Sequence, residues 1–226
     1  MAGKAKNKKM ECRYCKAQCI KVGIRSNSQR YYCKPCIKYQ QEQYKYKAYE
    51  QETDKEICEH IKEGCGVRSI ARLLHISPTT VIKRTKRLAK QIVKPVYHLT
   101  RKNYEMDELR TYIRNKTNRY WVAYAIRKDT KEVVDFKVGK RNKGTLRRVI
   151  DTLLLSEAKK IYTDGYPLYR TLIPPELHRR SKYKINHIER KNLSIRTHLK
   201  RLSRKTICFS KSIVMLEACL KIYFWG

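Results

Sequence analysis

Three acidic residues stand out because they lie in a strongly basic part of the chain, where residues 101–226 contain 31 basic and only 12 acidic side chains. Asp107 lies within an alternating apolar segment, Asp164 ends the segment KKIYTD, and Glu189 opens a run with helical periodicity. Carboxylates that converge from two strands and a helix are suitable ligands for hard cations such as Mg²⁺ or Mn²⁺. Two such ions promote displacement at phosphorus. Metal-dependent phosphodiester chemistry is therefore one interpretation of these residues.

Each of these acids also has a purely structural interpretation, and spacing alone leaves both open. Asp164–Gly165 is compatible with an ordinary turn, and a glutamate is favourable in the first turn of a helix. The helix expected to begin near Glu189 carries a polar stripe along one side. Its members are Glu189, Asn192, Arg196 and Lys200. In this arrangement Glu189 can face a sheet edge while Arg196 and Lys200 hold phosphate.

Five of the nine cysteines are crowded into 25 residues near the N-terminus. Four of them form two C-x-x-C pairs that are separated by 17 residues: Cys12, Cys15, Cys33 and Cys36. This spacing is typical of a structural zinc site, in which four thiolates close a tetrahedron and leave no catalytic position. The metal would supply folding energy that so short a segment cannot obtain from a core. Free thiols at chance spacing are the alternative, and Cys19 is a spare thiol that could replace one ligand.

The segment GVRSIARLLHISPTTVIKRTKRL has the length and the short turn of a DNA-reading helix–turn–helix. Ser77 is a favourable N-cap and Pro78 a favourable first residue for its last helix, expected over 79–90. The residues expected to face DNA are Thr79, Thr80, Lys83, Arg84 and Arg87. Those expected to face the neighbouring helices are Val81, Ile82 and Leu88. A plain helical hairpin with a solvated basic surface is the alternative.

The remaining periodicity predicts the elements that must position these residues. Residues 11–37 are expected to form a strand-poor cysteine module and 38–50 a connector, followed by helices within 51–90. Strands are expected at 103–113, 119–129, 131–141 and 159–166, and helices at 143–155, 188–202 and 212–225. Alternation of strands and helices of this kind predicts a mixed α/β sheet with helices on its faces.

The formal net charge of the 226 residues is +34, which needs a polyanion to offset it, and nucleic acid is the commonest one. This charge excludes an acidic disordered protein and argues against an ordinary metabolic enzyme. The sequence contains no run of about 18 apolar residues that would span a membrane. The N-terminal MAGKAKNKKM lacks the apolar core of a secretory signal. We therefore expect a cytoplasmic protein that acts on DNA.

Residues 104–213 resemble the transposases of the insertion sequence one family. The segments that carry the resemblance are YEMDE, YWVAYAI, VGKR, IYTDGYPLY, HIERKNLSIRTHLKRLSRKT and ICFSKS. Upstream, the two C-x-x-C pairs and GVRSIARLLHISPTTVI resemble the zinc and helix–turn–helix region of the same family. In many members these two regions are encoded in overlapping frames joined by frameshifting, whereas they are continuous here.

The resemblance implies an α/β fold with a ribonuclease-H-like catalytic domain of the DDE type, whose acids hold two Mg²⁺ or Mn²⁺ ions. Carried over to this sequence, the acids are Asp107, Asp164 and Glu189, with 24 residues between the last two. The partner residues after the glutamate are Arg190, Asn192 and Arg196. The residues alone do not separate Asp107 from the adjacent Glu108, but the resemblance does. The expected domains are a zinc-binding module at 1–40, a helix–turn–helix domain at 41–95 and the catalytic domain at 96–226.

These observations predict a DNA transposase that binds the terminal inverted repeats of an insertion sequence. It would catalyse metal-dependent 3′-end cleavage and strand transfer into target DNA, as a homo-oligomer that holds both ends. A non-catalytic DNA-binding regulator of the element is the main alternative. A tyrosine recombinase is a weaker one, because the superficial match of His187, Arg190 and Tyr223 conflicts with the strands expected at 104–139. An RNA-binding zinc protein is disfavoured by the helix–turn–helix.

Overall fold

The computed structural model describes residues 10–25, 27–42, 48, 50, 52–95, 101–181 and 183–226. They belong to two compact units, Met1–Glu50 and Gln51–Gly226, which are described separately below. The domain boundary expected after residue 95 adjoins residues 96–100, which lie outside the described residues. Within the described ranges, no helix has the length and apolarity needed to cross a bilayer.

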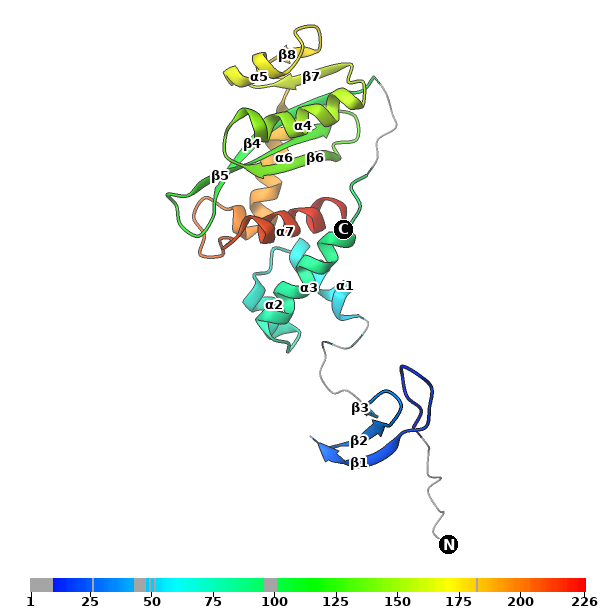
Figure 1. Ribbon diagram of the computed structural model, residues 1–226. Coiled ribbons are helices and arrows are strands. Elements are labelled where there is room, and N and C mark those ends of the chain that lie inside the picture. The colour runs from blue at the N-terminus through cyan, green and yellow to red at the C-terminus, as the bar shows by residue number, and fades with distance from the viewer. Residues whose placement is uncertain are drawn as a thin grey trace. The chain divides into compact units, whose positions relative to one another are not determined.

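The first unit contains an antiparallel sheet of three strands in the order β1-β2-β3 (Figure 1). The strands span Ile20–Arg25, Ser28–Cys33 and Lys38–Gln41. The expectation of a strand-poor module was therefore wrong, and β3 takes up the first residues of the expected connector. The sequence pattern did not indicate β1 because all six of its residues are exposed. A strand without a buried face lacks the alternation by which strands are recognised in sequence.

The second unit begins with three helices, α1 (Thr53–Lys62), α2 (Val67–Leu73) and α3 (Pro78–Gln91). The last of them begins as the sequence predicts, because the Ser77 side chain accepts a hydrogen bond from the Thr80 backbone N–H at 3.0 Å. Val81 of α3 is fully buried against its neighbours, as expected. Ile82 is instead 37% exposed, so the expectation that it faces the other helices was wrong.

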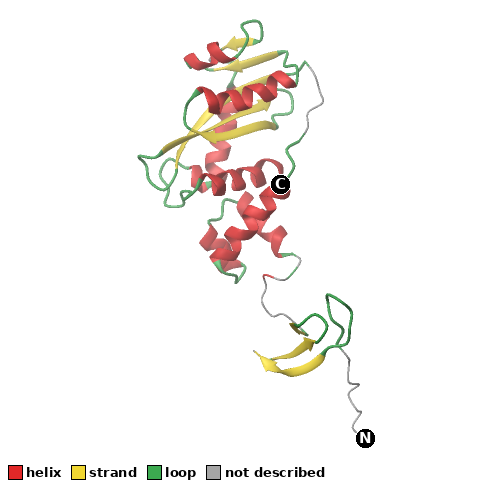
Figure 2. Ribbon diagram, in the orientation of Figure 1, coloured by secondary structure: helices red, strands yellow, loops and turns green. Residues whose placement is uncertain are grey.

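A mixed sheet of five strands follows, in the order β6-β5-β4-β7-β8 (Figure 2). Its strands are β4 (Asn103–Tyr112), β5 (Arg119–Arg127), β6 (Val133–Gly139), β7 (Lys160–Thr163) and β8 (His178–Arg180). Strand β4 pairs antiparallel with β5 and parallel with β7, and β7 pairs parallel with β8. The four strands expected from the sequence are all present, whereas the three-residue β8 was not expected.

Helices cover both faces of this sheet, as Figure 1 shows for α4 in front and α6 behind. The covering helices are α4 (Lys143–Leu155), α5 (Pro167–Leu172), α6 (Asn186–His198) and α7 (Ile213–Trp225). Alternation along β4 decides which core each side chain enters. Tyr104 and Met106 pack with α4 and α5, whereas Leu109 packs with α6 and α7. Glu105 and Asp107 are four and two positions before Leu109, so they point to the same face of the sheet and face α6.

Two details of the helices differ from expectation. Helix α5 was not expected, because a six-residue helix is too short to show a period. The helix expected at 188–202 begins at Asn186 and ends at His198, and Lys200–Leu202 forms a separate 3₁₀ turn. The Arg196 guanidinium donates to the carbonyl oxygen of Leu202 at 2.7 Å, which holds this turn against the helix end.

Helix α7 lies between the α1–α3 helices and the sheet (Figure 1) and contacts α1, α3 and β6. Lys221 of α7 donates to the carbonyl oxygens of Ala89 and Ile92 at the end of α3, both at 3.2 Å. At the other side, the Trp225 indole N–H donates to the carbonyl oxygen of Val133 at 2.8 Å. One helix therefore anchors the three-helix segment and the sheet to each other.

Gly64 fixes a second close approach, between the end of α1 and the end of α6. Its φ of +74° lies in the left-handed region. The N–H groups of Gly64 and Cys65 donate to the carbonyl oxygens of Ile61 and His60 at 3.0 and 2.8 Å, which is a Schellman motif. A Cβ atom at Gly64 would lie 1.9 Å from the carbonyl oxygen of His198. Backbone conformation and lack of space both require glycine here.

Gly64→Ala should therefore lower the free energy of unfolding by about 2 kcal/mol or more, from left-handed strain and a backbone clash. Urea unfolding followed by far-UV circular dichroism measures the change. Gly144→Ala in α4 is the matched control, because the nearest atom to its new Cβ would be the Asn142 Oδ1 at 3.7 Å. That variant should be neutral or up to about 1 kcal/mol more stable. Equal unfolding midpoints for the two variants would contradict this account of Gly64.

Candidate active site

Three carboxylates gather where β4 and β7 lie side by side. Asp107 and Glu108 are in β4, and Asp164 directly follows β7. One oxygen from each lies within 4.8 Å of the others. The strands are parallel with Glu105 opposite Tyr162, so the positions two residues further on are also neighbours. The structure thereby brings together two of the three acids expected from the sequence, Asp107 and Asp164.

The Asp107 carboxylate also binds helix α6. Its Oδ1 accepts a hydrogen bond from the Glu108 backbone N–H at 2.7 Å, and its Oδ2 accepts one from Asn192 Nδ2 at 2.7 Å. The Asn192 side-chain oxygen in turn accepts from the Tyr124 hydroxyl at 2.9 Å. The expected partner residue Asn192 is thus in direct contact with an expected catalytic acid.

Burial and mutual repulsion raise the proton affinity of this group. Burial raises the pKa of Asp107 to about 6, and the negative charges of Glu108 and Asp164 act in the same direction. Burial also raises the pKa of Glu108, against the lowering effect of the Arg141 charge. Contact with the buried Tyr169 hydroxyl also lowers the pKa of Glu108. Crowded carboxylate oxygens are the ligands that Mg²⁺ or Mn²⁺ prefers.

Glu108 lies in the site together with Asp107, from which the residues alone did not separate it, and Arg141, to which the sequence assigned no role, contacts it. The Glu108 side chain is 1% exposed, and its Oε2 accepts a hydrogen bond from Arg141 Nη2 at 3.1 Å. The Arg141 guanidinium also lies 3.6 Å from the centre of the Tyr166 ring. Arg141 lies in the VGKR segment, so its place in a shared motif was the available signal. The contact with Glu108 spans 33 residues and has no local pattern.

Glu189, the third expected acid, lies in the first turn of α6 with its side chain exposed. The structure does not bring it into the group formed by Asp107, Glu108 and Asp164. It precedes Asn192 by three residues, which places the two on the same side of the helix. Glu189 therefore lies on the side of α6 that Asn192 presents to the site.

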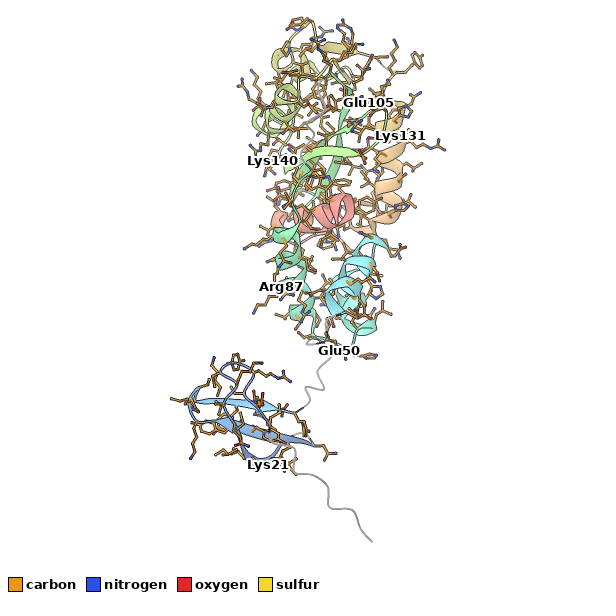
Figure 3. All side chains as sticks on the ribbon, turned by 90° about the vertical axis from the view of Figure 1, so that its right-hand side faces the viewer. Lys21, Glu50, Arg87, Glu105, Lys131 and Lys140 are labelled. Carbon is orange, nitrogen blue, oxygen red and sulfur yellow. The ribbon has the colours of Figure 1, made fainter. Side chains whose placement is uncertain are left out.

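The start of α6 is fixed by Glu105, a fully buried carboxylate that sequence reasoning missed. Figure 3 labels Glu105 at the sheet, beside α6 in pale orange. Its Oε2 accepts a hydrogen bond from the Ile188 backbone N–H at 2.9 Å, where the helix dipole favours negative charge. Lys128 Nζ lies 3.4 Å from the other oxygen. The signal was an acid two residues before Asp107, which places both carboxylates on one face of the strand.

Other basic residues that were expected near this site differ in how they are held. Arg190 and Lys200 are exposed. Arg196 instead forms hydrogen bonds within the protein, because it donates to the carbonyl oxygen of Arg110 at 3.0 Å as well as to that of Leu202. Burial lowers the pKa of Arg196, with the nearby Arg204 charge adding to the effect. Arg196 therefore braces α6 against β4.

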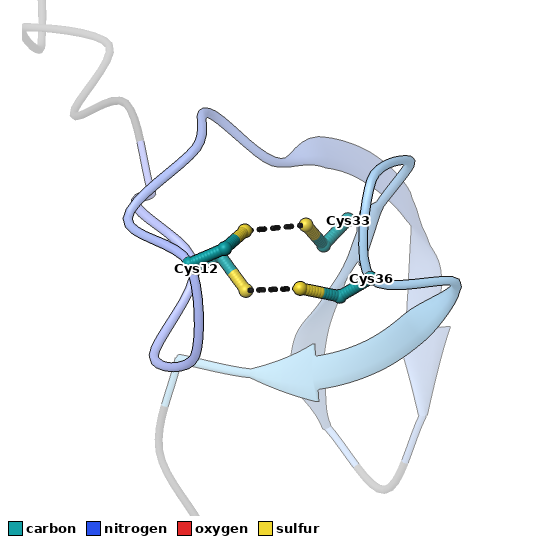
Figure 4. A group of neighbouring side chains, drawn as sticks. Cys12, Cys33 and Cys36 are labelled. Carbon is teal, nitrogen blue, oxygen red and sulfur yellow. Dashed lines mark hydrogen bonds between the residues drawn. The ribbon is translucent and has the colours of Figure 1, made fainter.

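In the first unit, the sulfur atoms of the four expected zinc ligands converge (Figure 4). They lie within 4.8 Å of one another and belong to Cys12, Cys15, Cys33 and Cys36. The distances are 3.9 Å from Cys12 to Cys36 and 3.5 Å from Cys15 to Cys33. A tetrahedral zinc ion with bonds of about 2.3 Å needs sulfur atoms about 3.8 Å apart. The donor set therefore fits a structural zinc ion.

Cys12 differs from Cys19 in its surroundings. The backbone N–H groups of Cys15 and Tyr14 lower the pKa of the Cys12 thiol to about 6. Cys19 is buried outside the four-sulfur group, and its sulfur accepts a hydrogen bond from Gln40 Nε2 at 3.2 Å. Burial raises the pKa of Cys19, which favours the neutral thiol. The structure thus places the spare cysteine in the small core of the module.

The residues of helix α3 that are expected to face DNA differ in how they are held by other side chains. Thr79 and Lys83 are exposed, and the Thr80 hydroxyl contacts that of Ser77 at 2.8 Å. Arg84 and Arg87 both pair with Asp54 of α1, with 2.6 Å between Arg84 Nη1 and Asp54 Oδ1. Figure 3 labels Arg87 on α3. The ion pairs set the direction of both guanidinium groups, a constraint that the sequence did not indicate.

Comparison with known proteins gives one family. A family model described as IS1 transposase matches residues 100–224. Insertion element IS1 protein InsB of Shigella flexneri is 38% identical over 119 residues, which cover 53% of this chain and 91% of that protein. Insertion element IS1 2 protein InsB of Escherichia coli K12 is 40% identical over 109 residues, which cover 48% and 65%.

Among solved structures, one match is a chain in the cryoEM structure of simian T-cell lymphotropic virus intasome in complex with PP2A regulatory subunit B56 gamma. The match covers 73% of this chain and 66% of that chain, with 14% sequence identity and a TM-score of 0.39. The sequence comparisons are the stronger result. Because the IS1 transposase model spans more than half of the sequence, the chain belongs to the IS1 transposase family.

Proposed function

We propose that this chain is a DNA transposase that binds the terminal inverted repeats of its element, cleaves their 3′ ends and joins them to target DNA. The observation that carries the proposal is the proximity of Asp107 and Asp164 at adjoining parallel strands, together with the hydrogen bond from Asn192 of α6 to Asp107. Membership of the IS1 transposase family gives the reaction class. The high positive charge is consistent with a DNA substrate, and we propose that the protein acts on this DNA in the cytoplasm.

The catalytic part is proposed to be ribonuclease-H-like and of the DDE type. The strand order β6-β5-β4-β7-β8, with three antiparallel strands followed by two parallel ones, supports this fold. Asp107 and Asp164 would hold divalent metal ions together with Glu189, which lies one helical turn from Asn192. Glu108 contributes a fourth carboxylate to the same place. Bound Mg²⁺ or Mn²⁺ would activate the attacking oxygen and stabilise the leaving oxygen at phosphorus.

The protein's own residues would position this chemistry. Asn192 orients the Asp107 carboxylate, and Glu105 holds the start of α6 so that Glu189 stays beside the site. Arg190 and Lys200 are exposed on the same element and its 3₁₀ continuation, where they can bind DNA phosphate. The reaction would proceed by direct attack of water and then of a 3′-OH, without a covalent protein–DNA intermediate.

DNA-end recognition is proposed for the two N-terminal modules. Helix α3 would act as the recognition helix of a helix–turn–helix, with Thr79, Lys83 and the oriented Arg84 and Arg87 contacting DNA. The zinc module would add a second contact. A homo-oligomer is proposed because both ends of the element must be held for strand transfer.

Asp164→Asn should abolish cleavage and strand transfer while end binding stays within about twofold of wild type. The isosteric amide removes a metal ligand but leaves the fold in place. The assay uses purified protein, a plasmid that carries the element's own ends, and Mg²⁺ against EDTA. Asp151→Asn is the matched control, because Asp151 is an exposed acid of α4. End binding by wild type without any metal-dependent product would favour the non-catalytic regulator instead.

Asp107→Asn should stabilise the protein at pH 7.5 in magnesium-free buffer, and the gain should shrink as the pH falls toward 4. The pKa of about 6 in the folded protein exceeds the ordinary value, so ionisation of Asp107 costs stability above pH 6 and not below about pH 4. Two pKa units correspond to roughly 3 kcal/mol. Urea unfolding of both proteins at several pH values measures the difference, which includes a constant effect of the altered hydrogen bonds. A difference that does not change with pH would refute the raised pKa.

Cys33→Ser should abolish zinc binding and weaken binding to the terminal repeats. Removal of one of four thiolates leaves an incomplete tetrahedron, and the module depends on the metal for its folding energy. Bound zinc is measured by atomic absorption after gel filtration. Cys19→Ser is the control, because Cys19 lies outside the four-sulfur group, and it should keep one zinc ion per chain. Stoichiometric zinc in the Cys33 variant would disprove the assignment.

A further inference from the structure

Two arginines from different elements flank the short segment Asp164–Tyr166. Arg141 lies between β6 and α4, and its guanidinium contacts the Tyr166 ring and Glu108. Arg180 is the last residue of β8 and is paired with Thr163 at the end of β7. Both guanidinium groups therefore lie next to the segment that begins with a proposed metal-binding acid.

The contact between Arg180 and Gly165 is unusually close. A Cβ atom at Gly165 would lie 2.8 Å from Arg180 Nη2 and 3.1 Å from its Nε. Gly165 is not among the residues with positive φ, so its backbone conformation does not require glycine. The missing side chain instead provides the space in which the guanidinium lies against the backbone. In the sequence this glycine was compatible with an ordinary turn, and the structure gives it a second role.

The two arginines approach the carboxylates from one face of the sheet. Arg180 follows His178 by two residues, and His178 Nε2 lies 2.7 Å from the Thr163 hydroxyl on the side where α5 packs. Glu108, the partner of Arg141, alternates with Asp107 along β4 and so points away from α6. The arginines thus lie on the α5 side of the carboxylate group, and Asn192 contacts it from the α6 side.

Among the described residues, Arg180 has no hydrogen-bond acceptor or ion-pair partner, although its guanidinium lies against Gly165, the residue after Asp164. Its side chain is exposed, so its donors are available to a ligand. Arg141 gives one hydrogen bond to Glu108 and is 36% exposed. Guanidinium groups present several donors in a planar fork that matches phosphate oxygens. A DNA phosphate at this place would otherwise meet three carboxylates.

We propose that Arg141 and Arg180 bind the phosphate of the DNA strand that reacts at the Asp107–Asp164 site, and that Gly165 is glycine to let Arg180 reach it. This inference rests on the proposed transposase function. The ligand is a phosphodiester at or next to the scissile position. The arginines offset the charge of the acids and fix the phosphate for in-line attack.

Arg180→Ala should reduce the single-turnover rate of Mg²⁺-dependent end cleavage about tenfold or more, since it removes a positioned donor from the reacting group. Binding of a duplex that carries the terminal repeat should stay within about twofold of wild type. Arg179→Ala is the matched control. The adjacent Arg179 is exposed and donates only to the carbonyl oxygens of Pro175 and His178 among the described residues. It removes the same charge from the same strand and should cleave at the wild-type rate.

Gly165→Ala is the second variant, because its new methyl group must displace the Arg180 guanidinium. It should show the same loss of cleavage as Arg180→Ala, and the double variant should be no worse than either single one. Additive losses would show that the glycine acts independently of the arginine and would overturn that part of the proposal.

The remaining outcomes separate this inference from the proposed function. No metal-dependent cleavage by wild type would reject the transposase activity and this inference with it. Wild-type cleavage with equal rates for Arg179→Ala and Arg180→Ala would leave the function intact and reject the phosphate contact. A loss of end binding by Arg180→Ala as large as its loss of cleavage would show a general DNA contact away from the reacting phosphate, which also rejects the inference.

Discussion

The site depends on the attachment of one helix to one strand through carboxylates. Glu105 and Asp107 project from the same face of β4, and each accepts a hydrogen bond from α6, from the Ile188 backbone N–H and from Asn192. Buried carboxylates are costly unless they are paired, so this arrangement strongly favours a single position for the helix. Asp107 has two functions as a result, because the group that orients α6 also belongs to the carboxylate group.

The sequence predicts the long elements of the fold because each of them buries one face. Helix α4 has the expected bounds of 143–155, and the Ser77 cap begins α3 as expected. The elements that were missed lack a buried face or have six residues or fewer, among them β1, α5 and β8. Their existence depends on partners far along the chain. The pairing of β8 with β7, for example, gives His178–Arg180 its extended conformation.

The candidate site was predictable to the extent that its residues belong to motifs. The two aspartates and the four cysteines, which spacing and family resemblance singled out, lie in two groups of converging side chains. Contacts between segments that are distant in the chain could not be predicted from local sequence patterns. The ion pairs of Asp54 with Arg84 and Arg87, and the pairing of Glu108 with Arg141, are examples. Both sets of contacts involve acids in a basic chain, so the scarcity of negative charge was one indication of their importance.

Helix α7 has a consequence for how this protein can be recombined with its relatives. It buries one side against α1 and α3 and another against the sheet, and it comes last in the sequence. In a chimaera that exchanges only residues 51–95, helix α7 of one parent would face helices α1 and α3 of the other. Apolar surface on both sides of this contact would then be left without its matching partner. Helices α1, α3 and α7 have to be exchanged together, so sequence changes in these distant segments should be correlated across the family.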